Sequence, residues 1–210
     1  AKALNYSPAI LPGSAQALLF DGQNNITIPP GGEATSDALQ FPFQFGEDLA
    51  ISFHVKGRSG PMTWHAVSFT PNYVSQPNSG SVASDESGVQ MASPSFGWFF
   101  LSGMDVFRPD SPGSLVALGD SITDGFFQTL NMRWTDRLAE RLNTAGIKAG
   151  VLNQGINSNT VTNARNGDAG LPANQRFERD VLNMPGVKTL LLFEGTNDLG
   201  ASVSSAELIQ

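Results

Sequence analysis

The strongest constraint on the fold is an alternation of strand-like and helix-like segments that fills the second half of the chain. The expected elements are, in order, a strand at residues 115–118, a helix from Trp134 to Gly146, a strand at 150–152, a helix at 172–184 and a strand at 187–193. In the first helix, Trp134, Leu138 and Leu142 recur at i, i+4 and i+8, and Gly146 is a typical C-terminal stop. Elements in this order imply a parallel sheet with right-handed crossovers.

The second helix and the third strand carry more specific expectations. Pro172 suits a first helical turn, and Phe177, Val181 and Leu182 are expected to form the buried face of that helix. The run VKTLLLF at 187–193 is almost continuously apolar, which favours a strand that is buried on both faces.

The first half of the chain has a different pattern, with short strands separated by turns. Leu49, Ile51, Phe53 and Val55 alternate with polar residues, which is typical of a half-buried strand at 49–57. Further short strands are expected at 17–20, 25–28, 64–70 and 97–101. This pattern favours an antiparallel, jelly-roll-like β-sandwich at 1–112. A linker at 108–113 would join it to an α/β domain at 113–210.

Composition excludes several classes of function. The chain has 210 residues, a formal net charge of −7 and no cysteine. The acidic balance argues against nucleic-acid binding, and the lack of cysteine excludes a disulfide framework or a thiolate nucleophile. No metal-binding cluster or other cofactor site is recognisable, and no apolar run is long enough to span a membrane. Low charge with many Ser, Thr, Asn and Gly favours a secreted protein whose signal peptide has already been removed.

Polar residues follow each predicted parallel strand, where ligands bind in α/β sheets. Ser121 lies on the corner after the first strand, Gly155 follows the second, and Asn197 follows the third. A hydroxyl nucleophile, backbone N–H groups at Ser121 and Gly155, and the side-chain amide of Asn197 would form an oxyanion site for acyl transfer. Turn formation is the competing interpretation, because Gly, Asn and Asp are common in turns.

Three sequence blocks resemble the GDSL/SGNH hydrolase family. GDSITDG at 119–125, NQGINSNTV at 153–161 and EGTNDLG at 194–200 occur in the order of the family's blocks, and the resemblance covers residues 113–210. It implies the first part of a flavodoxin-like three-layer α/β/α domain and metal-free hydrolysis of carboxylic esters. By position it makes Ser121 the nucleophile and first oxyanion donor, Gly155 the second donor and Asn197 the third. The stretch at 176–200 also resembles a secreted branch with an N-terminal β-sandwich.

The base that activates the serine is missing from the sequence. The family uses a histidine with an aspartate three residues before it. This chain has only His54 and His65, both in the first half; His54 is expected to be a plain surface residue and His65 to be structural. Residues 204–210 begin a helix pattern, and only three strands of a five-stranded sheet are present. We therefore expect a C-terminal segment or second chain that carries the remaining strands, the histidine and its aspartate.

Several residues have two interpretations that the sequence leaves open. Asp120 and Asp124 either tune the nucleophile or cap the corner that carries it, and capping is favoured. The aromatic residues at 64 and 98–100 are either sandwich core or a platform for stacking sugars. The whole chain is thus expected to be a serine esterase acting on an acyl ester, a lipid or an acetylated carbohydrate. The alternative is an inactive carbohydrate- or surface-binding protein that uses its sandwich domain.

Overall fold

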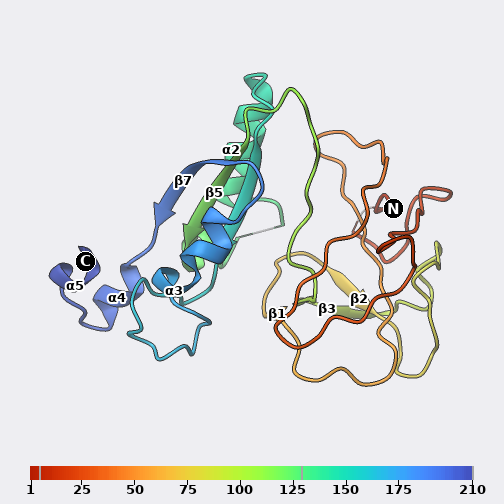
Figure 1. Cartoon of the computed structure of the whole chain (residues 1–210), viewed down its shortest axis with the longest axis horizontal. Coiled ribbons are helices and arrows are strands. Elements are labelled where there is room, and N and C mark those ends of the chain that lie inside the picture. Colours follow the sequence, from red (N-terminus) through yellow and green to blue (C-terminus); the bar gives the residue numbers. More distant parts are fainter. Residues whose placement is uncertain (5, 129, 210) are drawn as a thin grey trace. The chain divides into compact units, whose positions relative to one another are not determined.

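The structure is a computed structural model that describes residues 1–4, 6–128 and 130–209. The chain divides into two compact units, residues 1–101 and 102–210, which are described separately below (Figure 1). No helix in the described part of the chain has the length and hydropathy needed to cross a membrane.

The second unit contains a parallel sheet of three strands. These are β5 (Ser114–Gly119), β6 (Gly150–Gly155) and β7 (Val187–Phe193). They pair in the order β6-β5-β7, with Val116 opposite Leu152 on one side and Leu190 on the other. All three strands were predicted, and their order matches the first three strands of a flavodoxin-like sheet. β5 is the central strand, and its Val116, Ala117 and Leu118 are at most 1% exposed.

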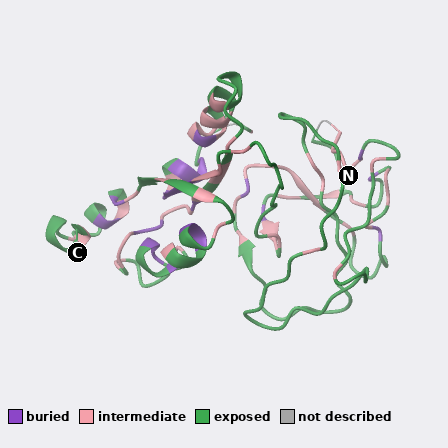
Figure 2. Ribbon diagram, turned by 45° about the horizontal axis from the view of Figure 1, so that its top comes forward, coloured by how far each residue is buried: buried purple, intermediate pink, exposed green. Residues whose placement is uncertain are grey.

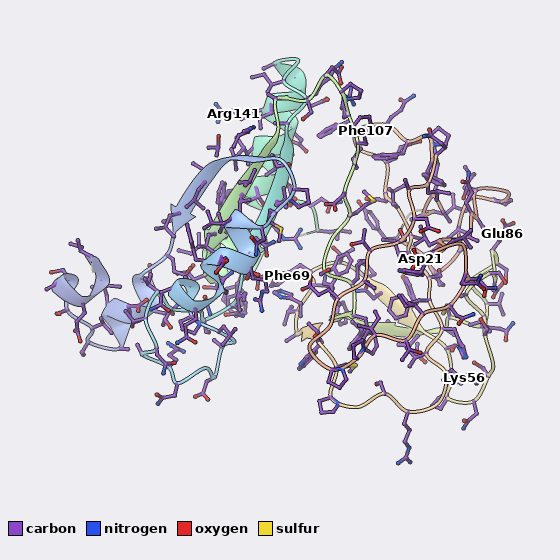
Figure 3. The ribbon with its side chains drawn as sticks, in the orientation of Figure 1. Asp21, Lys56, Phe69, Glu86, Phe107 and Arg141 are labelled. Carbon is purple, nitrogen blue, oxygen red and sulfur yellow. The ribbon has the colours of Figure 1, made fainter. Side chains whose placement is uncertain are left out.

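Helices follow each strand, and those within the predicted ranges 134–146, 172–184 and 204–210 are present. α1 (Ser121–Asp124) and α2 (Trp134–Thr144) follow β5, and Gly146 at φ +75° lies just beyond the end of α2. Charged residues of α2 such as Arg141 are exposed (Figure 3). Pro172 precedes α3 (Ala173–Phe177), which continues into the π-helical turn η1 (Glu178–Leu182). α4 (Thr196–Gly200) and α5 (Ser205–Ile209) follow β7. Of these helices, α1 and α4 were not predicted.

One face of the sheet packs against the α3–η1 segment. Val116 and Leu118 pack against Ala173 and Val181 of the α3–η1 segment, which forms the core of this unit. Leu182 was predicted to be buried, but it is 58% exposed, because successive residues of a helix point in directions about 100° apart and Val181 occupies the buried face.

β7 is not buried on both faces, contrary to the prediction. It lies at the edge of the sheet, and Leu191, Leu192 and Phe193 are 38%, 60% and 51% exposed (Figure 2). The apolar run correctly identified a strand, but burial also requires elements that cover it, and the described residues place none over these three side chains. The predicted further strands therefore remain a prediction.

The first unit has little regular structure among its described residues. β1 (Trp64–His65) pairs with β4 (Trp98–Phe99), and β2 (Asn72–Val74) pairs with β3 (Ser93–Ser95), both antiparallel. The predicted β-sandwich is not confirmed by these two short pairs.

The predicted strand at 49–57 also lacks a ladder of hydrogen bonds in the structure. Leu49 forms an isolated bridge with Lys2, and Ile51, Phe53 and Val55 are 37–47% exposed. Alternation specifies a strand only where a neighbouring strand completes its hydrogen bonds. The predicted strands at 17–20 and 25–28 likewise have no ladder, and at 20–23 the chain makes a tight turn closed by a bridge.

Candidate active site

Ser121 is the first residue of α1, directly after the carboxyl end of β5, and it is partly exposed. Asp120 precedes it as the helix cap, with Oδ1 accepting a hydrogen bond from the Ile122 N–H at 2.9 Å. The Asp120 side chain is 1% exposed, so its role is to fix the corner that presents Ser121.

The corner requires glycine at position 119. A Cβ atom there would lie 2.1 Å from Thr123 Oγ1 and 2.6 Å from the carbonyl oxygen of Phe193. Those distances are shorter than any non-bonded contact, so a side chain would push α1 away from the end of β7. Glycine therefore lets the corner that carries Ser121 and the end of β7 approach each other.

Gly155 is buried at the end of β6 and packs against the same corner. A Cβ atom at this position would lie 2.2 Å from the backbone nitrogen of Asp124. Its own N–H donates to Asn153 Oδ1 at 2.9 Å, while Asn153 Nδ2 donates to the Thr123 carbonyl at 2.6 Å. The Gly155 N–H, which was predicted to be an oxyanion donor, therefore lies beside α1. Its hydrogen bond to Asn153 Oδ1 must break before this N–H can bind a ligand oxygen.

Asn197 lies in α4, which begins after Gly195 at φ +112°. Its Nδ2 donates to the carbonyl oxygen of Asn159 at 2.8 Å, which uses one of the two amide hydrogens. The neighbouring Asp198 is fully buried and accepts hydrogen bonds from Val161 N–H and from both donors of Thr162. Asp198 thus ties α4 to the loop after β6.

Asp124 links α1 to the loop after β6. It is 5% exposed, and its Oδ2 accepts a hydrogen bond from the Asn157 N–H at 3.1 Å. Its contact supports the expected capping role, because the carboxylate holds the loop after β6 against α1.

Sequence reasoning missed a buried pair beneath these loops. Arg176 of α3 and Glu194 at the end of β7 both have side chains with no exposed surface, and Arg176 Nη2 lies 3.6 Å from Glu194 Oε2. Burial raises the pKa of Glu194 to about 7, the Arg176 charge opposes that rise, and the carboxylates of Asp120 and Asp198 add to it. The sequence signals were Arg176 in the charged segment RFERD at 176–180 and Glu194 at the start of EGTNDLG, and neither signal indicated that the two side chains are buried together.

Comparison with known proteins identifies the second unit. Residues 117–210 match the family model of the GDSL-like lipase/acylhydrolase family. This segment is a GDSL-like lipase/acylhydrolase domain. No curated protein matches the chain.

Solved structures similar to the chain come from the same group. AlinE4, an SGNH-hydrolase family esterase, is 24% identical over 49% of this chain and 49% of its own, with a TM-score of 0.39. A putative lipolytic G-D-S-L family protein from Desulfitobacterium hafniense DCB-2 is 29% identical over 47% of each chain, with a TM-score of 0.35. The chain spans about half the length of these two proteins.

The GDSL-like domain contains no histidine within residues 102–210. His54 is exposed in the first unit, and His65 is paired with Trp98 in β1 of that unit. Among the described residues, no group of three or more His, Cys, Asp or Glu side chains is arranged to hold a metal ion.

Proposed function

We propose that the protein is a serine esterase that hydrolyses carboxylic esters through an acyl-enzyme on Ser121. The observation that carries the proposal is the convergence of Ser121, Gly155 and Asn197 at one edge of the sheet. The loops that bear them are joined by the contacts of Gly119, Gly155 and Asp198, in a segment that matches an acylhydrolase family.

The proposed reaction has two steps. Ser121 Oγ attacks the ester carbonyl carbon while a base takes its proton, and the resulting oxyanion accepts hydrogen bonds from the Ser121 and Gly155 N–H groups and the Asn197 amide. The tetrahedral intermediate collapses, the C–O bond to the alcohol breaks, and the base returns the proton to the leaving alkoxide. Water then attacks the acyl-enzyme in the same way, and the acid is released with Ser121 restored.

We further propose that the base is a histidine, oriented by an aspartate, from a C-terminal segment or second chain that adds strands beside β7. Two features support this. Residues 102–210 have no histidine, and β7 is an edge strand of the described sheet on which Leu191, Leu192 and Phe193 are exposed. An edge strand with exposed apolar side chains is suited to pairing with a further strand. The substrate class within esters and secretion of the protein are parts of the same proposal, and the low content of charged residues supports secretion.

Labelling with a fluorophosphonate tests the proposal. The intact mass under denaturing conditions is measured first, to show whether a second polypeptide accompanies the chain. The wild-type protein should then gain one phosphonyl group, which peptide mapping should place on Ser121, and Ser121→Ala should abolish the gain. Ser204→Ala, at the exposed start of α5, serves as the control and should label normally. A wild-type protein that never labels would exclude the esterase.

A carbohydrate-binding role for the first unit is the second candidate, and one observation favours it. Trp64 is 58% exposed and stacks on Phe99 with their rings 4° from parallel and 6.5 Å apart. A flat, exposed indole of this kind suits stacking against a sugar ring. Co-sedimentation with insoluble polysaccharides should detect the binding, and Trp64→Ala should remove it; equal sedimentation of both proteins would exclude this role for Trp64.

A further inference from the structure

Arg176 uses all of its hydrogen-bond donors inside the protein. Its Nε and Nη2 donate to Asn159 Oδ1 at 3.1 and 3.0 Å, and Nη1 donates to the Gln154 carbonyl at 2.8 Å. Nη1 also donates to Asp180 Oδ2, and Nη2 to the Gly119 carbonyl, both at 3.2 Å. A guanidinium has five N–H groups, so these five hydrogen bonds use every donor of the Arg176 side chain.

Two of these acceptors are the carboxyl ends of neighbouring strands. The Gly119 carbonyl ends β5, two residues before Ser121, and the Gln154 carbonyl immediately precedes the Gly155 N–H in β6. One rigid guanidinium plane therefore fixes the separation between the corner that carries the nucleophile and the strand end that carries the second donor.

The third acceptor of Arg176 is Asn159, which also contacts Asn197. Asn159 is 1% exposed. Its side-chain Oδ1 accepts hydrogen bonds from Arg176, and its backbone carbonyl oxygen accepts a hydrogen bond from Asn197 Nδ2 at 2.8 Å. The Asn159 amide nitrogen is held by the carbonyls of Ala169 and Leu171, both at 2.9 Å. Arg176 thus sets the position of the residue that orients the Asn197 amide.

The end of β7 faces the same guanidinium. Glu194 Oε2 lies 3.6 Å from Arg176 Nη2, and neither carboxylate oxygen of Glu194 has a hydrogen-bond partner among the described residues. All three strand ends are therefore in contact with one buried cation.

Packing alone does not account for an arginine at this position. A buried guanidinium has a large desolvation penalty, and an apolar side chain of similar volume often stabilises a core equally well. The neighbouring core positions of the same segment, Ala173 and Val181, are apolar. Only a planar group with several directed donors reaches acceptors on two strands and a loop together.

We infer that Arg176 is a positioning residue, whose guanidinium holds the loops carrying Ser121, Gly155 and Asn197 at the separation required for acyl transfer. This role rests on the proposed esterase function, but the geometric part of it is measurable without turnover.

Arg176→Lys separates the geometry from the charge. Lysine keeps the positive charge but has a single ammonium group, which cannot donate hydrogen bonds to Gly119, Gln154 and Asn159 at the same time. Amide nitrogen–hydrogen NMR spectra should show shifts at Ser121, Gly155 and the Asn197 side chain. Arg137→Lys, a substitution of an exposed arginine on α2, should leave all three unchanged. Shifts confined to α3 and η1 would overturn the inference.

Reactivity provides a readout that a purely structural role would not move. With a fluorophosphonate, Arg176→Lys should lower the maximal rate of inactivation by about 100-fold, the effect expected of a displacement near 1 Å, with the half-saturating concentration unchanged. Circular dichroism should remain that of the wild type. A rate equal to that of the wild type and of Arg137→Lys would overturn the inference.

The wild-type protein supplies a test that needs no folded variant. Four acceptors should stop rotation about the Cζ–Nη bonds of Arg176, so its Nη hydrogens should give separate resonances in slow exchange with water. One averaged signal, as expected of an exposed arginine, would overturn the inference. A wild-type protein that does not react with the phosphonate would instead refute the esterase proposal, and the NMR results would still decide the geometry around Arg176.

Discussion

Glu194→Gln should change how the stability of the GDSL-like domain depends on pH. The ordinary glutamate pKa of 4.5 is raised to about 7 in the folded protein, chiefly by burial. Between these values the folded protein holds a proton that the unfolded chain has released, so the free energy of unfolding falls as pH rises from 4.5 to 7. A tenfold difference in proton affinity corresponds to about 1.4 kcal/mol, so the loss is at most about 3 kcal/mol.

Glutamine has the shape of the protonated carboxyl group and does not titrate. The stability of the wild type minus that of Glu194→Gln should therefore be largest near pH 4.5, decline toward pH 7 and then level off. Arg176, Asp120 and Asp198, the charged groups that face Glu194, are present in both proteins, so the comparison isolates this carboxyl group.

Urea unfolding followed by circular dichroism at 222 nm is a suitable assay, because the described helices all lie in the second unit. Glu178→Gln, which changes an exposed residue of η1, controls for the substitution itself. If the stability difference between the wild type and Glu194→Gln is the same at pH 4.5 and pH 8, Glu194 does not hold a proton near neutrality and the reasoning is refuted.

Three further substitutions have defined outcomes. Gly155→Ala should lower the free energy of unfolding in urea by about 1–3 kcal/mol, because the added Cβ would overlap the Asp124 backbone. Gly200→Ala, where the added Cβ has nothing within 4 Å, should cause no loss, and equal stabilities of the two variants would contradict this packing. Asn197→Ala should slow phosphonylation of Ser121 by about 100-fold or more with an unchanged dichroism spectrum, and an unaltered rate would remove Asn197 from the oxyanion site. Asp198→Asn should cost about 1–3 kcal/mol in urea unfolding, because the buried carboxylate accepts three hydrogen bonds; an unchanged midpoint would count against its role in joining the loops.

The sequence predicted the second unit well because its patterns are local. Trp134, Leu138 and Leu142 define a helix face within one segment, and β5 and β7 are apolar runs bounded by glycine or by a Pro-Gly turn. Ser121, Gly155 and Asn197 were found from one topological rule, that carboxyl ends of parallel strands lie at one edge. Their roles in catalysis remain a proposal.

The features that sequence reasoning missed depend on contacts between distant segments. Arg176 and Asp180 are spaced i, i+4, which is typical of an exposed salt bridge on a helix, yet both are buried. Their burial follows from acceptors at Gly119 and Gln154, which no local pattern reveals. In the first unit, alternation at 49–57 was visible, but whether a partner strand lies beside it is not encoded in that segment.

The order of strands in the sheet also determines when it forms during synthesis. β5 is the central strand but leaves the ribosome first, and its neighbours β6 and β7 begin only at Gly150 and Val187. Until β7 has emerged, the apolar run Val116–Leu118 lacks one of its two hydrogen-bonding neighbours. Parallel pairings between segments this far apart in the sequence form slowly, so the central strand of the sheet waits longest during synthesis for its full set of hydrogen bonds.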